Sequence, residues 1–350
     1  MKITDFSRRE YLRRASLREM RKREKSNSKA IAKREQRSGF FEIKCPRTLR
    51  LTAVDARKKV ISFVDSIHRH VDKGRKRLWI DFSGLEKVYA EGMIFVYAEI
   101  SRLNNVKKLD VRSTPPKDKV VRQVFNKIGF SKLIKCSIKR TPESNRDDVA
   151  TWFCASGEEV EGEKCKNILE KYQGHIATSL SRDLFTGMTE AMTNARQHAY
   201  IKERGDNLIH TDYYKPWWMF SQEINGKLKV VFCDLGLGIP NTLPISHPGF
   251  FKSLLRQLGK DLTDSRAIEE AVTITRSRTE QSHRGKGLSQ IVATIDNSEE
   301  SDIIILSNKG SYRLAKGGDV RLFDFSTSIK GTIVCWQVSL PDSFTSAKAA

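Results

Sequence analysis

The 350-residue chain is organised around one stretch, Glu190-Ala-Met-Thr-Asn194-Ala-Arg-Gln-His198-Ala-Tyr200. Apolar residues recur three and four positions apart through it, which predicts an amphipathic helix with one buried stripe. Glu190, Asn194 and His198 are four apart and form a second stripe, at the boundary between core and cleft. A carboxylate in such a position can act as a base that orients a water molecule. A carboxamide one turn later can supply an oxygen ligand to a hard cation such as Mg²⁺. Solvated helix faces carry the same spacing, so this stretch alone leaves the function open.

Three further motifs follow this helix along the chain. A run typical of a buried strand, Val230-Val-Phe-Cys-Asp234-Leu-Gly236-Leu-Gly238-Ile-Pro240, ends in an acid and two glycines. Next comes a glycine pair flanked by cations, His283-Arg284-Gly285-Lys286-Gly287-Leu288-Ser289, and then a strand that opens with Gly331-Thr332. In this order the four motifs resemble the nucleotide-binding superfamily of gyrase, heat-shock chaperones, histidine kinases and mismatch-repair ATPases (GHKL). The first motif looks most like that of the anti-sigma-factor serine kinases within this superfamily.

The resemblance implies a site for ATP and Mg²⁺. In it Asn194 would hold the Mg²⁺, Glu190 would be the general base, and Asp234 would accept a hydrogen bond from the adenine amino group. Thr332 matches the adenine-side threonine of the family. The other positions expected to bind the nucleotide are glycines and cations, namely Gly236, Gly238, Arg284, Gly285, Lys286 and Gly287, together with Leu288 of the second glycine box. His198 is left open between a catalytic role and a hydrogen-bonded position near the lid that the family forms between Leu243 and Ser282.

Upstream, residues 40–140 show a β-α-β-loop-α-β-α order, which predicts a small α/β unit. The run Ile80-Asp-Phe-Ser-Gly-Leu, followed by Val88-Tyr-Ala90-Glu91-Gly92-Met93, resembles the signature of STAS domains, the anti-sigma-factor antagonists. In that family a serine phosphorylated by the partner kinase often precedes the glycine, whereas this chain has Ala90 and Glu91 there. The resemblance therefore implies a module that docks a protein partner without this phosphorylation switch. An unrelated small α/β domain is the alternative.

These motifs divide the chain into four parts. We expect a basic helical or disordered arm at 1–39, a STAS-like domain at 40–140, a polar linker at 141–149 and an ATP-binding domain of the GHKL type at 150–350. The expected fold class is α/β throughout. In the last domain, helices should cover one face of a mixed, mostly antiparallel sheet, with a hairpin turn at Asn225-Gly226.

Charge suggests further partners. The chain has 63 Lys and Arg against 42 Asp and Glu, a net charge of +21, and much of the excess lies in the arm. This favours contact with nucleic-acid phosphates, with an acidic protein or a solvated tail as alternatives, and the arm lacks the interleaved aromatic residues that stack on bases.

The cysteines have no metal-ligand spacing and are expected to be free; they are Cys45, Cys136, Cys154, Cys165, Cys233 and Cys335. With no apolar run of membrane-span length and no signal-peptide core at the start, we expect a cytoplasmic protein without a membrane contact.

Together these observations predict a Mg²⁺-dependent, ATP-binding regulatory or effector ATPase whose nucleotide state controls lid closure or partner binding. The first alternative is a protein serine kinase of the anti-sigma type. The second is a scaffold that binds ATP without hydrolysing it. A homodimer is left open by the sequence.

Overall fold

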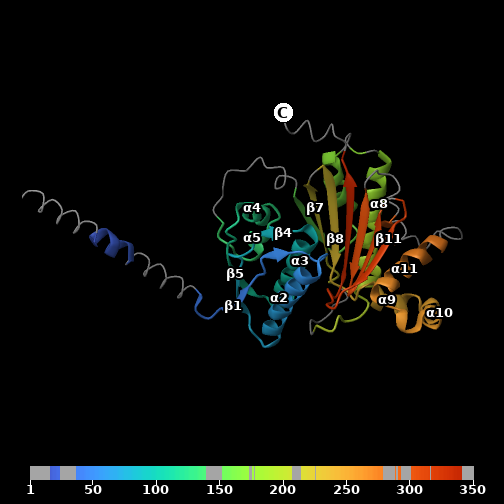
Figure 1. Cartoon of the computed structure of the whole chain (residues 1–350), viewed down its shortest axis with the longest axis horizontal. Helices are drawn as coiled ribbons and strands as arrows, with labels where there is room; N and C mark the ends of the chain where they lie inside the picture. Colours follow the sequence, from blue (N-terminus) through green and yellow to red (C-terminus); the bar gives the residue numbers. More distant parts are fainter. Residues whose placement is uncertain are drawn as a thin grey trace, which may run out of the picture.

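A seven-stranded sheet with the strand order β11-β10-β9-β12-β8-β7-β6 lies at the centre of the protein. The computed structural model describes residues 16–23, 37–138, 152–172, 176, 178–206, 214–224, 226–278, 288, 291–292, 301–315 and 317–340. Within these residues the chain is an α/β protein, as predicted. A first unit, residues 37–138, contains a small parallel sheet, and a second unit, residues 152–340, contains the large sheet (Figure 1).

The first unit follows the predicted β-α-β-loop-α-β-α order. Its three-stranded parallel sheet has the order β1-β3-β5, and a short pair, β2 and β4, lies beside it. The strands are β1 (Phe41–Lys44), β2 (Thr48–Leu49), β3 (Arg77–Asp81), β4 (Lys87–Val88) and β5 (Asp110–Thr114). The helices are α2 (Val54–Asp72), α3 (Ala90–Lys107), α4 (Lys119–Lys127) and α5 (Phe130–Leu133). Helix α2 forms because apolar residues such as Val60, Val64 and Ile67 recur three and four apart and are buried.

The second unit has the predicted hairpin and the predicted late strands. Gly226, with a φ of 69°, turns the chain between β7 and β8. The strands are β6 (Phe153–Gly157), β7 (Trp217–Ile224), β8 (Lys227–Asp234), β9 (Asp302–Ser307), β10 (Gly310–Ala315), β11 (Val320–Asp324) and β12 (Thr332–Ser339). The helices are α7 (Gly162–Leu169), α8 (Thr178–Asn194), α9 (Ile239–Ser246), α10 (Pro248–Leu258) and α11 (Asp264–Arg278), with the short helices η1 (Glu170–Tyr172), η2 (Ala195–Ala199) and η3 (Gly259–Asp261). Each described strand pair of this sheet is antiparallel, where a mixed sheet was expected.

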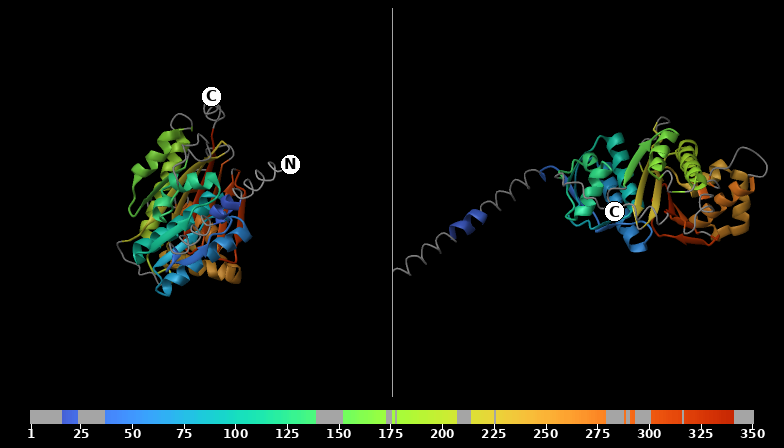
Figure 2. Two further views of the ribbon diagram at one scale, coloured as in Figure 1. Left: turned by 90° about the vertical axis from the view of Figure 1, so that its left-hand side faces the viewer. Right: turned by 90° about the horizontal axis from the view of Figure 1, so that it is seen from above.

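Both faces of the large sheet are apolar and both are covered. Successive strand residues point to opposite faces, so in β8 Val230 and Phe232 pack with helices α7, α8 and α11, while Val231 and Cys233 pack with the first unit. The sequence predicted helices on one face only. The structure adds α3 of the first unit on the other face (Figure 1), and the two units lie side by side (Figure 2, right).

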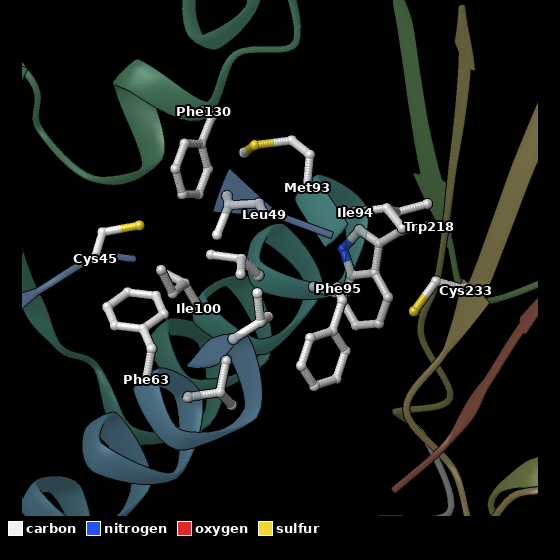
Figure 3. Close-up of a cluster of buried hydrophobic side chains, with 14 of the residues drawn as sticks. Cys45, Leu49, Phe63, Met93, Ile94, Phe95, Ile100, Phe130, Trp218 and Cys233 are labelled. Atoms are coloured by element: carbon white, nitrogen blue, oxygen red, sulfur yellow. The ribbon is translucent and has the colours of Figure 1, made fainter. Parts of the chain in front are cut away.

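Helix α3 joins the two units through one continuous core. Its residues Ile94 and Phe95 belong to the same buried cluster as Trp218 of β7 and Cys233 of β8 (Figure 3). Tyr97 of α3 also meets Phe220 of β7 edge to face, with ring centroids 5.5 Å apart. The hydrophobic contacts of α3 are therefore shared between its own sheet and the sheet of the second unit.

Glu91, at the position where the STAS resemblance would place a switch residue, is buried in this interface. Its side chain is 1% exposed and pairs with Lys229 of β8, with 3.1 Å between Oε2 and Nζ. Desolvation lowers the pKa of Lys229, but Glu91 outweighs it and raises that pKa above its ordinary value. The fixed negative charge expected at Glu91 thus serves a contact within the chain.

Replacing Glu91 with Ala should lower the free energy of unfolding by about 3 kcal/mol, because it leaves the Lys229 ammonium buried without its partner. Urea denaturation at neutral pH measures this. Glu86→Ala is the matched control, since Glu86 pairs with Arg47 in solvent and its loss should cost less than about 1 kcal/mol. Equal losses in the two variants would contradict a structural role for the buried pair, and Glu91→Met combined with Lys229→Met should recover most of the stability.

Three further expectations can be compared with the fold. Of the predicted basic arm, residues 16–23 are described and form an exposed helix, and the rest up to residue 36 lies outside the described residues. The six cysteines are free, and Cys233 and Cys335 are buried in strands as expected. Across the described ranges, no helix combines the length and the apolar character that a membrane span needs.

Candidate functional site

A cavity of about 240 Å³ lies on the helix-covered face of the large sheet, between the end of α8, the ends of β8 and β12, and helix α9. Five residues predicted for the site line it, namely Asn194, Asp234, Gly238, Leu288 and Thr332, together with His198, whose role the sequence left open. They come from all four sequence motifs, which span residues 190–332. The remaining lining is largely apolar, with Phe232, Ile239 and Val334 among its residues. An apolar cavity with a few convergent polar groups is the usual form of a small-molecule site, although such sites are commonly about 300–1,000 Å³.

Asp234 is the buried acid of this cavity. It ends β8 opposite Thr332 of β12, and its side chain lies on the cavity face because it has the same parity as Phe232. Its Oδ1 accepts a hydrogen bond from the Gly236 N–H at 3.0 Å, and the Thr332 N–H also donates to the carboxylate. Burial outweighs these hydrogen bonds and raises the pKa of Asp234 to about 7. The site therefore holds a carboxylate with unused acceptor capacity in apolar surroundings.

The two predicted glycines have different roles. A Cβ on Gly236 would come within 2.2 Å of the Ala199 carbonyl oxygen, and the next residue, Leu237, donates its N–H to that carbonyl at 2.8 Å. Gly236 thus permits close packing against the end of the motif helix and does not line the cavity. Gly238 lines the cavity with a φ of 80°, and a Cβ there would meet the Asn308 carboxamide at 2.6 Å. Only a glycine satisfies both requirements at position 238.

The motif helix carries the predicted carboxylate and carboxamide at its end. Glu190 is half-buried one turn before Asn194, and burial raises its pKa. Glu190 is not among the residues that line the cavity, whereas Asn194 is. The Nδ2 atom of Asn194 is buried without a hydrogen-bond partner. Because the oxygen and nitrogen of a carboxamide exchange places by rotation, Asn194 can present either a donor or an acceptor here.

Directly after Asn194 the α-helix widens into a π-helix, η2, which contains His198. The sequence predicted a regular helix through Tyr200, with His198 in line with Asn194. The wider turn shifts His198 off that line, a feature that often marks functional sites. Burial and the nearby His247, at the junction of α9 and α10, lower the pKa of His198. His198 therefore faces the helical segment where a lid was expected, which forms α9, α10 and α11.

Part of the predicted site cannot be compared with the structure. Arg284, Gly285, Lys286 and Gly287, the second glycine box, lie outside the described residues. Leu288, at its end, is described and lines the cavity.

Three residues that sequence reasoning missed hold the cavity floor together. The Ser307 hydroxyl lies 3.1 Å from that of Thr332 and accepts the Ile239 N–H at 2.8 Å. The Asn308 side chain donates to the Leu237 carbonyl at 2.9 Å and accepts the Gly331 N–H at 3.3 Å. The Tyr200 hydroxyl accepts the Leu235 N–H at 2.9 Å. Tyr200 ends the quoted helix motif, and Asn308 stands two residues before a glycine, which is typical of a tight turn, whereas Ser307 left no signal.

Asn308 also connects the cavity to the first unit. Its main-chain oxygen accepts a hydrogen bond from Arg57 Nη2 of α2 at 2.7 Å. Arg57 is fully buried, its guanidinium lies 4.1 Å from the Phe325 ring centroid, and burial lowers its pKa to about 10. One residue of the second unit therefore contacts both the loop at Gly238 and a buried cation of the first unit.

The described residues of the cavity offer hydrogen-bond acceptors and donors but no preformed metal cage. No group of three or more His, Cys, Asp or Glu among them could hold a metal ion. The arrangement suits a ligand with a flat apolar part and an amino group at Asp234. Comparison of the chain with models of known protein families found no match, and comparison with curated proteins found none either.

Proposed function

We propose that the chain binds ATP with Mg²⁺ in the cavity between α8, β8, β12 and α9, and that nucleotide binding regulates an ATPase activity or the binding of a partner. The observation that supports this most is the convergence of Asn194, Asp234, Gly238, Leu288 and Thr332 on one cavity. Chance would rarely bring four motifs so far apart in sequence to one place. Their order along the chain, which resembles that of GHKL proteins, supplies the identity of the ligand.

The adenine ring would lie among the apolar side chains, with its amino group at Asp234. A carboxylate accepts hydrogen bonds from an amino group, whereas guanine presents a carbonyl oxygen at the matching position, which the carboxylate would repel. The Thr332 hydroxyl, held by Ser307, lies on the same side. These groups support a preference for ATP over GTP.

Asn194 fits a Mg²⁺ that is held mainly by the phosphates. Mg²⁺ usually keeps several waters and takes one or two protein ligands in nucleotide sites, so it does not need the cluster of acids that the described residues lack. The Asn194 carboxamide, whose Nδ2 atom has no hydrogen-bond partner, would supply one oxygen ligand after rotation. When bound, the metal would neutralise charge on the phosphates, and Glu190, one turn earlier, would orient the attacking water or hydroxyl as the general base.

Asp234→Asn tests the proposed adenine contact. The variant should bind ATP about 10–100-fold more weakly, because the Gly236 N–H would hold the amide oxygen and leave the NH₂ group facing the adenine amino group. Isothermal titration with Mg·ATP measures this, with GTP as the competing ligand. Asp302→Asn is the matched control, since Asp302 is a buried strand acid outside the cavity and should leave ATP affinity unchanged. Unchanged ATP affinity in Asp234→Asn would overturn the proposed site.

The same variant has a second readout, because the pKa of Asp234 is raised from 3.8 to about 7. Between these values the folded protein binds the proton more tightly than the unfolded chain, so Asp234 lowers stability progressively as pH rises through this window. Without ligand, Asp234→Asn should therefore be more stable than the wild type at pH 8 and lose this advantage toward pH 4. Weaker ligand binding combined with higher stability identifies a residue kept for function.

Two alternatives remain for what the bound ATP does. A protein serine kinase would transfer the γ-phosphate to a hydroxyl of another protein, since Ala90 and Glu91 offer none at the STAS-like position. A scaffold would bind ATP and leave it intact.

A separate protein partner would contact the first unit away from the part of α3 that the large sheet covers. Nucleic-acid binding by the arm, a homodimer and a cytoplasmic location stay predictions.

A further inference from the structure

The outer face of the small sheet gathers arginine and aromatic side chains that lie apart in sequence. Leu78, Ile80 and Val111 point inward to the core, so their neighbours in β3 and β5 point outward. The register aligns Glu42, Trp79 and Arg112 across the three strands. We call this surface, with Arg37, Phe40 and Arg77, the outer sheet face. It lies on the side of the first unit away from the large sheet (Figure 2).

The guanidinium groups of this face are stacked on its rings. Arg77 lies 4.3 Å and Arg112 lies 4.9 Å from the Phe40 ring centroid, and Arg37 lies 5.0 Å from that of Trp79. The Phe40 and Trp79 rings meet edge to face at 5.8 Å. Stacking fixes the plane of a guanidinium and leaves the N–H groups of Arg77 available at its edge, whereas Arg37 donates to Glu42 and Thr114. Phe40 thus supplies an aromatic contact directly after the arm.

Acidic side chains neutralise this face only in part. Glu42 pairs with Arg37 at 2.9 Å, and Asp110 pairs with Lys135 at 2.7 Å and with Arg112 at 3.6 Å. Arg77 is exposed, and its guanidinium is near enough to Asp110 to help lower the pKa of that carboxyl. Exposed cations lie at the adjoining turns, namely Lys73, Lys76 and Lys108. The Asp110 N–H donates to the Lys76 carbonyl at 2.8 Å, so the two turns are neighbours.

We propose that the outer sheet face binds single-stranded nucleic acid. Phosphates would pair with the exposed cations and the guanidinium edges, and bases would stack on the guanidinium planes over Phe40. The large exposed hydrophobic residues of the described chain, such as Val54, Val320 and Phe323, lie elsewhere. Their absence from this face argues against insertion into a membrane and against an apolar protein interface. This inference is independent of the proposed ATP site.

The test uses the full chain and a labelled single-stranded oligonucleotide of mixed sequence, with fluorescence anisotropy over a series of salt concentrations. Arg77→Gln combined with Arg112→Gln should weaken binding at least tenfold. It should also reduce the slope of log affinity against log salt concentration by up to about 1.4, since each phosphate contact contributes about 0.7. The matched control is Lys252→Gln with Arg256→Gln, two exposed cations of α10. It removes the same charge from a different surface and should change affinity much less.

Phe40→Leu separates stacking from charge. It keeps an apolar side chain and should weaken binding without changing the salt slope, because no cation is lost. Urea denaturation of each variant checks that the fold is intact. Equal losses in the face variant and the α10 control would overturn the proposal, because net charge alone would then explain binding. Tighter binding of a duplex of the same sequence, or equally effective competition by polyglutamate, would overturn it too.

Discussion

Replacing Glu190 with Gln is expected to lower ATP turnover by about 10²–10⁴-fold, the usual contribution of a positioned general base, and to leave ATP affinity nearly unchanged. The variant keeps the size and helix propensity of the residue but cannot accept a proton. Burial raises the pKa of Glu190, so wild-type turnover should fall with falling pH at a higher pH than for an exposed Glu. The variant should lack this pH-dependent loss.

The assay follows γ-labelled ATP with Mg²⁺ and separates the three functions. Released phosphate identifies an ATPase, label on protein identifies a kinase, and intact ATP at saturating binding identifies a scaffold. Asp183→Asn, on the same helix α8, is the matched control and should keep wild-type turnover. Equal turnover in Glu190→Gln and the wild type would remove Glu190 as the base.

Replacing Arg204 with Met is expected to lower the free energy of unfolding by about 5 kcal/mol, at the upper end of the cost of breaking a buried ion pair. Arg204 is 4% exposed, bridges Glu99 at 2.9 Å and Asp206 at 2.7 Å, and donates to the Lys330 carbonyl. Arg102 also bonds Asp206, at 2.6 Å. Removing Arg204 leaves Glu99, 2% exposed, with His68 as its remaining ion-pair partner.

The pH dependence gives a sharper signature of this network. Burial opposes ionisation of Glu99, but Arg204 and His68 outweigh it and hold its pKa below the ordinary value; Arg204 and Arg102 do the same for Asp206. Depressed carboxyl pKa values stabilise the fold above the unfolded pKa, near 4, and this stability is lost as pH falls below it. In Arg204→Met this dependence should shrink or reverse. Arg321→Met, which breaks an exposed pair with Asp319, should cost less than about 1 kcal/mol; a similar loss in both would contradict the network's role.

The sequence predicted the elements well where local pattern and turn residues decide them. Helix α2, strand β3 and the β7–β8 hairpin follow from apolar spacing and from the Asn225-Gly226 turn. Asn194 and Asp234, which the sequence placed in one site, both line the cavity. They lie close together because helix α8 ends at Asn194 and strand β8 ends at Asp234. The change from α- to π-helix after Asn194 was missed, since apolar spacing in a short segment does not separate the two.

The packing of the two units was missed for a different reason. Alternation in a strand shows which residues share a face, but not which element covers that face. A signal was present, because Val230-Val-Phe-Cys is apolar on both faces, as in sheets buried on both sides. Arg57 in a helix and Lys229 in a strand resembled solvent-facing residues, and both are buried by partners far away in sequence.

The contact between α3 and the large sheet is made within one chain, and this determines how it can be controlled. Two separate proteins with such a contact would associate and dissociate with concentration, whereas tethered partners meet at a high effective concentration that dilution does not change. Expression level therefore cannot set the occupancy of this interface. Any signal that separates the two units must act through a change of conformation that breaks the buried links at Arg57 and Glu91.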